Sequence, residues 1–334
     1  MNIKDWYLGI LQNNKRSAVP IMTHPGIDLS GKKVIDAVCD GQIHAHAIEV
    51  LSKEYPSDAA TIIMDLTVEA EAFGSKINFQ QDEVPSISER IVYDEQSVKN
   101  LIVPQVGTAR TKEYLEATRL SVQNIKDKPI IGGCIGPFSL AGRLFNMTEI
   151  MTALYLEPET ITVLVEKCSA FLMEYVKEFK KTGAHGIVMA EPAAGLLSED
   201  ICEMFSSLFV RKIVEEVQDD NFMFILHNCG NTGHVTQSMI STGARGLHFG
   251  NKIDLVQTLK EVPSDVLVMG NLDPVSAFKM ANPQEFTKIV EDILIQTKPY
   301  KNFVLSSGCD VPPGVSKANI DAFYNALKAY NKSL

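Results

Sequence analysis

Eight short apolar runs alternate with longer amphipathic stretches along this chain of 334 residues. Each run has the length of a β-strand and is apolar on both faces, which is typical of parallel strands covered by helices on both sides. The runs occupy residues 18–22, 59–65, 129–136, 185–191, 223–229, 246–250, 266–272 and 303–308. Eight strands separated by helices predict an α/β fold, a closed (β/α)8 barrel.

An open, doubly wound sheet is the alternative fold, but no glycine-rich phosphate-binding turn follows the first run. The helical pattern is clearest in residues 158–183, which end on lysines and a glycine, and in 316–333, where Ser316 is a plausible N-cap. We expect one barrel domain over residues 1–334. We also expect a helical extension over about residues 1–16 and extra elements in 66–128.

The charge balance excludes several classes of partner. Lys and Arg number 31 against 41 Asp and Glu, a formal net charge of −10, so nucleic acid and anionic membrane surfaces are poor partners. The sequence predicts neither a membrane helix nor a secretory signal, and we expect a cytoplasmic protein. Its six cysteines are too few for a disulfide framework, so each is expected to be a packed thiol, a metal ligand or a nucleophile.

The ends of the runs carry side chains that bind metals. In such a barrel the active site lies at the carboxyl ends of the strands. His227 and Cys229 are two residues apart in the fifth run and face the same way, and Cys309 follows the eighth run. Two thiolates and one imidazole suit zinc, and three protein ligands leave a fourth position for a substrate. The alternative is a strand-end histidine beside two buried thiols.

The charge of this ligand set suggests a reaction. One neutral imidazole and two thiolates balance Zn²⁺, and a zinc-bound substrate thiol is deprotonated at neutral pH. Electron-rich thiolate ligands keep its sulfur nucleophilic, so the predicted site suits the alkylation of a thiol.

Several segments resemble the uroporphyrinogen decarboxylase superfamily, and within it the methylcobamide:coenzyme M methyltransferase branch. The resemblance covers nearly the whole chain, and the H-x-C…C zinc motif of that branch falls on His227, Cys229 and Cys309. The segment GNLDP is shared with the decarboxylases. The segments are DAATIIMDLTVEAEAFG (58–74), GCIGPFSLAGRLF (133–145), AEPAAGLLS (190–198), HNCGNTG (227–233), GNLDP (270–274) and SGCDVPPGV (307–315).

The resemblance implies a catalytic Zn²⁺ and methyl transfer from a methylated corrinoid, a methylcobamide, to a thiol acceptor such as coenzyme M. The thiolate attacks the methyl carbon and cobalt leaves as Co(I). The chain has no D-x-H-x-x-G motif for corrinoid ligation. The corrinoid is therefore expected on a separate small corrinoid-binding protein that docks over the barrel mouth. Another thiol or a folate remains open as the acceptor, and so does the oligomeric state.

The other candidate site residues can each have more than one role. Glu191 can be a fourth zinc ligand, a proton acceptor for the thiol or a capping carboxylate, and Asp65 is expected in the site because a strand-end carboxylate needs a partner or solvent. His248 can line the cavity or be a satisfied strand-end histidine. Gly230 and Asn231 can contact the corrinoid or only shape a turn.

Two rival functions remain. A tetrapyrrole decarboxylase shares Asp65, but that branch has an arginine-rich segment after the first strand, and residues 23–33 contain no arginine. Where that branch places a histidine after the last strand, this chain has Cys309. The second rival is a non-catalytic corrinoid-protein or metal-carrier module. For a sulfonate-bearing acceptor, Arg143 is a candidate ligand only through its neighbourhood.

Overall fold

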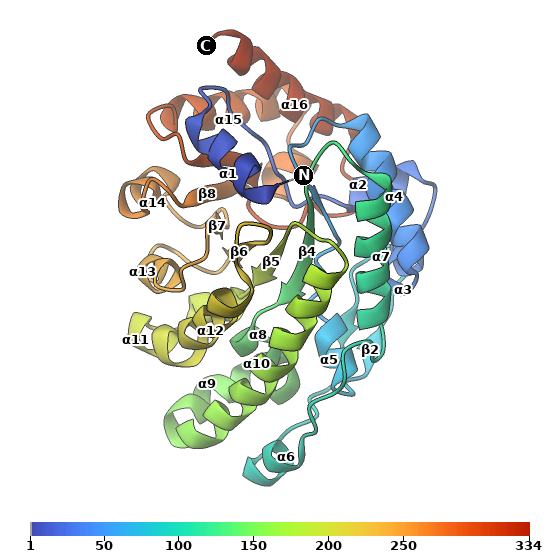
Figure 1. The fold of residues 1–334 in the computed structure, drawn as a ribbon, viewed down its shortest axis with the longest axis vertical. Helices are drawn as coiled ribbons and strands as arrows, with labels where there is room; N and C mark the ends of the chain where they lie inside the picture. The colour runs from blue at the N-terminus through green and yellow to red at the C-terminus, as the bar shows by residue number, and fades with distance from the viewer. Residues whose placement is uncertain (1) are drawn as a thin grey trace.

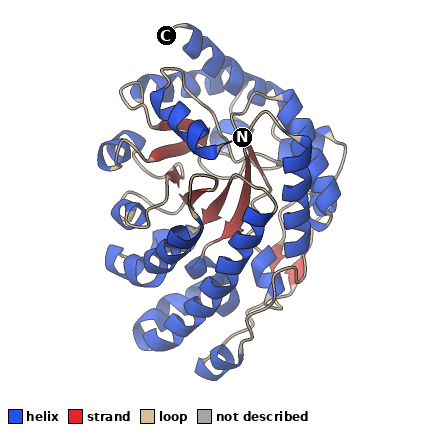
Figure 2. Ribbon diagram, viewed as in Figure 1, coloured by secondary structure: helices blue, strands red, loops and turns tan. Residues whose placement is uncertain are grey.

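Seven parallel strands form one sheet in the order β1-β4-β5-β6-β7-β8-β9 in the computed structural model, which describes residues 2–334. The sheet curls so that helices surround it (Figures 1 and 2). Seven of the eight predicted runs contain one of these strands. Their bounds are β1 (Ala60–Thr61), β4 (Ile130–Ile135), β5 (Gly186–Ala190), β6 (Met223–Asn228), β7 (Gly246–Phe249), β8 (Leu267–Leu272) and β9 (Phe303–Ser307).

The remaining run, residues 18–22, closes the ring between β9 and β1. It forms one parallel bridge, Ala18 to Leu305, instead of the predicted full strand. Pro20 lies in the middle of this run and has no N–H to donate to a ladder, which explains the short pairing. On the other side, the Met22 amide donates to the hydroxyl of Thr61, in β1, at 3.4 Å. The predicted α/β barrel is confirmed, with one strand reduced to a bridge.

Helices fill the intervals between the strands. Ser316 is the N-cap of the last helix and accepts a hydrogen bond from the Asn319 amide, as its position in the sequence predicted. No helix in the described part of the chain is long and apolar enough to span a membrane. Outside residues 62–129 the α-helices are α1 (Ile3–Gln12), α2 (His24–Leu29), α3 (Val34–Cys39), α4 (Gly41–Glu54), α8 (Pro137–Phe145), α9 (Met147–Leu156), α10 (Pro158–Lys181), α11 (Glu199–Cys202), α12 (Leu208–Val217), α13 (Thr236–Ile240), α14 (Leu255–Glu261), α15 (Pro283–Gln296) and α16 (Lys317–Lys332).

The connection between β1 and β4 contains several small elements. These are α5 (Val68–Ala72), the antiparallel pair β2 (Ile77–Asn78) and β3 (Ser86–Ile87), α6 (Glu95–Asn100) and α7 (Thr111–Asn124). Short helical turns also follow β5 and β8 and precede α12: η1 (Pro192–Leu196), η3 (Ser276–Met280) and η2 (Glu203–Ser207).

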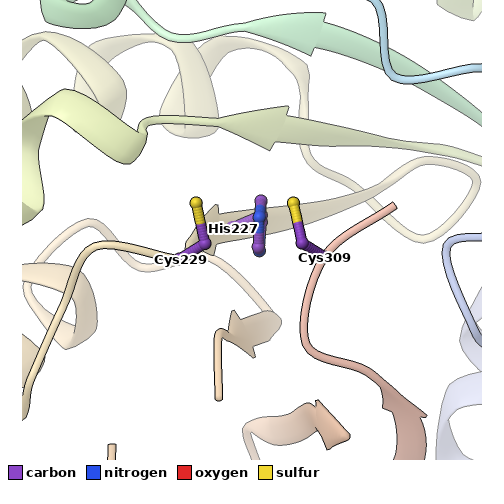
Figure 3. Close-up of side chains that lie close together, drawn as sticks. All are labelled: His227, Cys229 and Cys309. Carbon is purple, nitrogen blue, oxygen red and sulfur yellow. The ribbon is translucent and has the colours of Figure 1, made fainter. Parts of the chain in front are cut away.

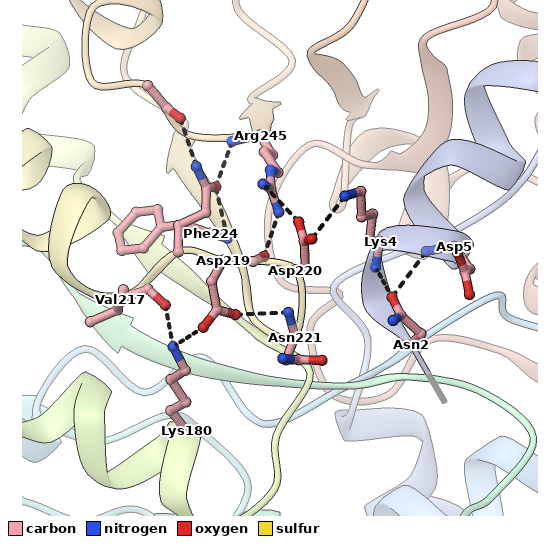
Figure 4. A network of polar contacts seen from close by, with 12 residues as sticks. Asn2, Lys4, Asp5, Lys180, Val217, Asp219, Asp220, Asn221, Phe224 and Arg245 are labelled. Atoms are coloured by element: carbon pink, nitrogen blue, oxygen red, sulfur yellow. Dashed lines mark hydrogen bonds and ion pairs between the residues drawn. The ribbon is translucent and has the colours of Figure 1, made fainter.

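Helix α1 lies across the amino-terminal end of the barrel (Figure 1). Its Ile3 and Ile10 are buried in the same apolar cluster as strand residues of the barrel interior. The Lys4 ammonium lies 2.8 Å from Asp220, just before β6, and Arg245 extends this polar network from the chain before β7 (Figure 4). The Trp6 indole donates to the carbonyl of Asp58 at 3.1 Å. This end of the barrel is therefore closed, and the opposite end is left for a site.

Candidate metal centre

Three predicted ligands meet at the carboxyl end of the barrel. His227 belongs to β6, Cys229 follows it directly, and Cys309 comes from the chain after β9. One ligand atom from each of the three residues lies within 4.8 Å of the other two. His227 lies between the two thiols, whose sulfur atoms point to the same side (Figure 3). The structure thus brings together residues that are up to 82 positions apart in the sequence.

A chain of hydrogen bonds decides which His227 nitrogen is free. The Ser306 hydroxyl donates to the Val19 carbonyl at 2.7 Å, so its oxygen accepts from His248 Nε2–H at 2.9 Å. His248 Nδ1 is then an acceptor, and it lies 2.8 Å from His227 Nδ1, which must carry the proton. His227 Nε2 is left with a bare lone pair, and it is buried without a hydrogen-bond partner. An imidazole with an unpartnered nitrogen, gathered with two thiols, is a donor arrangement that suits a zinc ion.

Each of the two thiols shifts the pKa of the other. The hydrogen bond from Cys309 lowers the pKa of Cys229 to about 7, against the effect of burial. The same hydrogen bond raises the pKa of Cys309, and burial adds to this effect. One thiolate therefore forms near neutral pH, and a bound cation would favour the loss of the second proton.

Glu191 lies directly after β5 with its carboxylate turned to α8. Its oxygens accept hydrogen bonds from the amides of Phe138 at 3.1 Å and Ser139 at 2.6 Å, and from the Ser206 hydroxyl at 2.9 Å. Burial raises its pKa, while these hydrogen bonds oppose the shift. Of the three roles expected for Glu191, this geometry agrees with that of a capping carboxylate at the first turn of α8.

Asp65 is buried next to α5, but a neighbouring cation already holds it. The Arg110 guanidinium lies 2.5 Å from one carboxylate oxygen and also pairs with Glu71. The other oxygen accepts from the hydroxyl of Thr67 at 2.6 Å and from its amide at 2.9 Å. The partner that a buried strand-end carboxylate requires is thus an arginine from 45 residues further along the chain.

The residues expected at a corrinoid contact support the turn after β6. Asn231 is fully buried, and its side-chain oxygen accepts from the amides of Gly233 at 2.7 Å and Val235 at 3.2 Å. A Cβ on Gly230 would lie 2.8 Å from the Pro192 carbonyl oxygen, so the close approach of η1 requires glycine here. His248 contacts the predicted ligand His227 and is fully buried.

A family model described as uroporphyrinogen decarboxylase (URO-D) matches residues 15–330. The chain belongs to the uroporphyrinogen decarboxylase family. Within that family it is 28% identical over 311 residues to a protein of Methanosarcina acetivorans described as methylcobamide:CoM methyltransferase MtbA, covering 91% of this chain and 89% of the relative. A uroporphyrinogen decarboxylase of Vesicomyosocius okutanii is 27% identical over 290 residues, covering 82% and 80% of the two chains.

A solved structure described as a methyltransferase from Methanosarcina mazei has the same fold. It superposes with a TM-score of 0.88 at 20% sequence identity and covers 99% of both chains. The chain thus resembles proteins of two described activities, at 28% and 27% sequence identity, and the residues of the site have to decide between them.

Sequence reasoning did not find the residues that support the site. Ser306, Arg110 and the pair His24–Asp310 act through contacts between segments far apart in the chain. The one usable signal was Asp310, which directly follows the predicted ligand Cys309 at the end of a strand. His24 is buried at the start of α2, beside Pro25 and Gly26.

Proposed function

We propose that this member of the uroporphyrinogen decarboxylase family is a zinc-dependent methyltransferase. It transfers a methyl group from a methylated corrinoid, carried by a small partner protein, to a thiol such as coenzyme M. The observation that carries the proposal is the juxtaposition of the His227 ring with the thiols of Cys229 and Cys309, together with a buried His227 Nε2 that has no hydrogen-bond partner. The relatives described as methylcobamide:CoM methyltransferases support the same reaction.

In this proposal each side chain has a defined task. His227, Cys229 and Cys309 hold the zinc ion, which when bound lowers the pKa of the acceptor thiol so that it binds as a thiolate. His248 Nδ1 accepts a hydrogen bond from His227 Nδ1–H and so keeps His227 Nε2 available. Glu191 fixes α8 against the end of β5. Gly230 and Asn231 shape the turn after the ligands and are assigned no direct contact with the corrinoid.

Decarboxylation of a tetrapyrrole is the rival within the family. A polycarboxylate substrate needs several cationic groups, and the segment 23–33 supplies no arginine. Asp65, which this chain shares with the decarboxylases, forms an ion pair with Arg110. The donor set of two thiols and an imidazole favours the methyltransferase, and its dependence on reduced thiols supports a cytoplasmic location.

Zinc content tests the proposal directly. We expect about one zinc per chain in the wild-type protein, and a loss or strong weakening of binding in Cys309→Ala. Cys39→Ala is the matched control, because Cys39 is an exposed thiol on α3 and should not affect zinc. With methylcobalamin as donor, the wild-type protein and the control should methylate thiols, and Cys309→Ala should not.

Two results would contradict the proposal. One is wild-type protein that binds no zinc when it is purified without chelators. The other is release of carbon dioxide from uroporphyrinogen by a chain whose Cys309→Ala variant remains equally active, which would favour the decarboxylase.

A further inference from the structure

Two of the three predicted ligands are thiols that lie close to each other and are accessible to solvent. One ligand atom from each of Cys229, Cys309 and His227 lies within 4.8 Å of the other two, so the two sulfur atoms are separated by no more than this distance. Both cysteines are partly exposed, whereas His227 is buried. Neighbouring, accessible thiols can form a disulfide as well as bind a metal.

The backbone brings the two cysteines together around one step of the chain after β7. A Cβ on Gly250 would lie 2.6 Å from Cys229 Cα, and a Cβ on Gly308, next to Cys309, would lie 2.8 Å from the amide nitrogen of Asn251. The consecutive residues 250 and 251 therefore contact the chain at one cysteine and directly beside the other. This close packing requires glycine at both positions.

A bond between the two sulfur atoms does not require any strand to separate from its neighbour. A disulfide has an S–S length of about 2.0 Å, so the sulfur atoms have to approach each other from within 4.8 Å. Cys229 directly follows β6 and Cys309 lies two residues after β9, so both lie beyond the paired residues of the sheet. The sulfur atoms already point to the same side (Figure 3). Rotation about the two Cα–Cβ bonds and a shift of these loop residues can bring them together.

We propose that Cys229 and Cys309 are a redox-sensitive pair, which forms an intramolecular disulfide when no metal is bound and a small disulfide or a hydroperoxide is present. The disulfide leaves His227 as the only available donor of the three, and one imidazole does not hold a zinc ion. Oxidation and metal binding therefore exclude each other. The disulfide itself is independent of the proposed function, but its effect on methyl transfer rests on the zinc ion proposed there.

The oxidation takes place in two steps of thiol–disulfide exchange. The thiolate of one cysteine attacks a sulfur of oxidised glutathione, forms a mixed disulfide and releases one glutathione thiolate. The second cysteine then attacks the protein sulfur of the mixed disulfide, and the second glutathione leaves. The two protons and two electrons lost by the cysteine pair pass to the two glutathione molecules. A hydroperoxide accepts the same two protons and two electrons and yields an alcohol and water.

Intact mass and peptide mapping test the pair. Cys39→Ala protein is the starting material, because Cys39 is an exposed thiol outside the pair. The reduced, chelator-treated protein is incubated with oxidised glutathione and analysed without reductant. We expect a loss of two hydrogens per chain, no retained glutathione, two fewer free thiols and a peptide that links Cys229 to Cys309. Dithiothreitol should reverse these changes.

Matched variants in the same Cys39→Ala background distinguish a pair from two separate thiols. Cys229→Ser and Cys309→Ser each keep one accessible thiol and should retain one glutathione, because no second thiol resolves the mixed disulfide. Cys202→Ser removes a buried thiol and should still form the disulfide. Thiols of Cys229 and Cys309 that stay reduced, or that retain glutathione without the linked peptide, would overturn the inference.

Zinc separates this inference from the proposed function. Protein loaded with zinc before oxidation should keep both thiols, and the oxidised protein should bind no zinc until it is reduced. Where the reduced protein binds zinc, oxidation at the same rate with and without the metal would overturn the mutual exclusion. If the reduced protein binds no zinc but forms the disulfide, the proposed function fails and the thiol pair stands. If zinc binds and no disulfide forms, only the thiol pair fails.

Discussion

At the scale of single residues, one row of hydrogen bonds orients the ring of a predicted metal ligand. It runs from the Val19 carbonyl through Ser306 and His248 to His227, and it favours the tautomer with N–H at His227 Nδ1. Imidazole ligands to metals commonly donate their second N–H in this way, and the partner sets both the tautomer and the ring orientation. The unusual feature is that this partner is itself a neutral histidine.

Replacing His248 should weaken zinc binding without removing a ligand. In His248→Phe the His227 Nδ1–H loses the imidazole acceptor and keeps only the backbone carbonyl of residue 248, at 3.3 Å, so the other tautomer becomes more accessible and zinc affinity should fall, by up to about 10- to 100-fold. Ser306→Ala leaves His248 in place and should have a smaller effect. Competition with a chelator measures the affinity, and His46→Phe, at an exposed position, is the control. Unchanged affinity in His248→Phe would show that the row has no influence on the metal.

At the scale of elements, the positions of the strands could be predicted from the sequence, but the extent of hydrogen-bonded pairing in residues 18–22 could not. Seven apolar runs each contain a strand because a strand buried on both faces needs apolar side chains on both. The run at 18–22 satisfies the same rule, but Pro20 limits its pairing to one bridge. Its side chains still contribute to the barrel interior, where Val19 and Ile21 are buried.

Helix α1 should contribute to the free energy of unfolding mainly through its apolar face. Ile10 is 6% exposed inside the cluster that fills the barrel, so Ile10→Ala should lower the free energy of unfolding by about 2–5 kcal/mol. Lys4→Ala removes an ion pair whose side chains are 48% and 54% exposed, and should cost less than about 1 kcal/mol. Urea unfolding measures both. Zinc content should be unchanged, because α1 lies at the opposite end of the barrel. An equal loss in the two variants would contradict this account.

At the scale of the whole molecule, the site could be predicted only where the topology of the barrel carried the information. His227 and Cys229 share a strand end, and Cys309 follows another strand whose end opens on the same mouth, so the three could be grouped from their positions alone. The bond between Asp65 and Arg110, or between Glu191 and the start of α8, depends on how helices pack in three dimensions. No periodicity in the sequence reports that packing.

The stability of the whole barrel should depend on pH through His44. This fully buried residue accepts a hydrogen bond from the Ile63 amide, and burial, with a small contribution from His24, lowers its pKa to about 3. Between pH 6.5 and 3 the unfolded chain binds a proton here and the folded chain does not. The free energy of unfolding therefore falls as the pH falls, by about 1.4 kcal/mol per pH unit from this residue.

His44→Gln keeps a hydrogen-bond acceptor but cannot titrate, so its free energy of unfolding should decline less steeply from pH 6 to pH 4. Urea unfolding at several pH values gives the slope. His46→Gln, on the exposed side of the same helix, should retain the wild-type slope. If the free energies of unfolding of wild type and His44→Gln differ by the same amount at every pH, His44 contributes to stability only through packing. If the slopes of the free energy of unfolding against pH differ by the equivalent of about one proton, the folded protein keeps the His44 imidazole neutral.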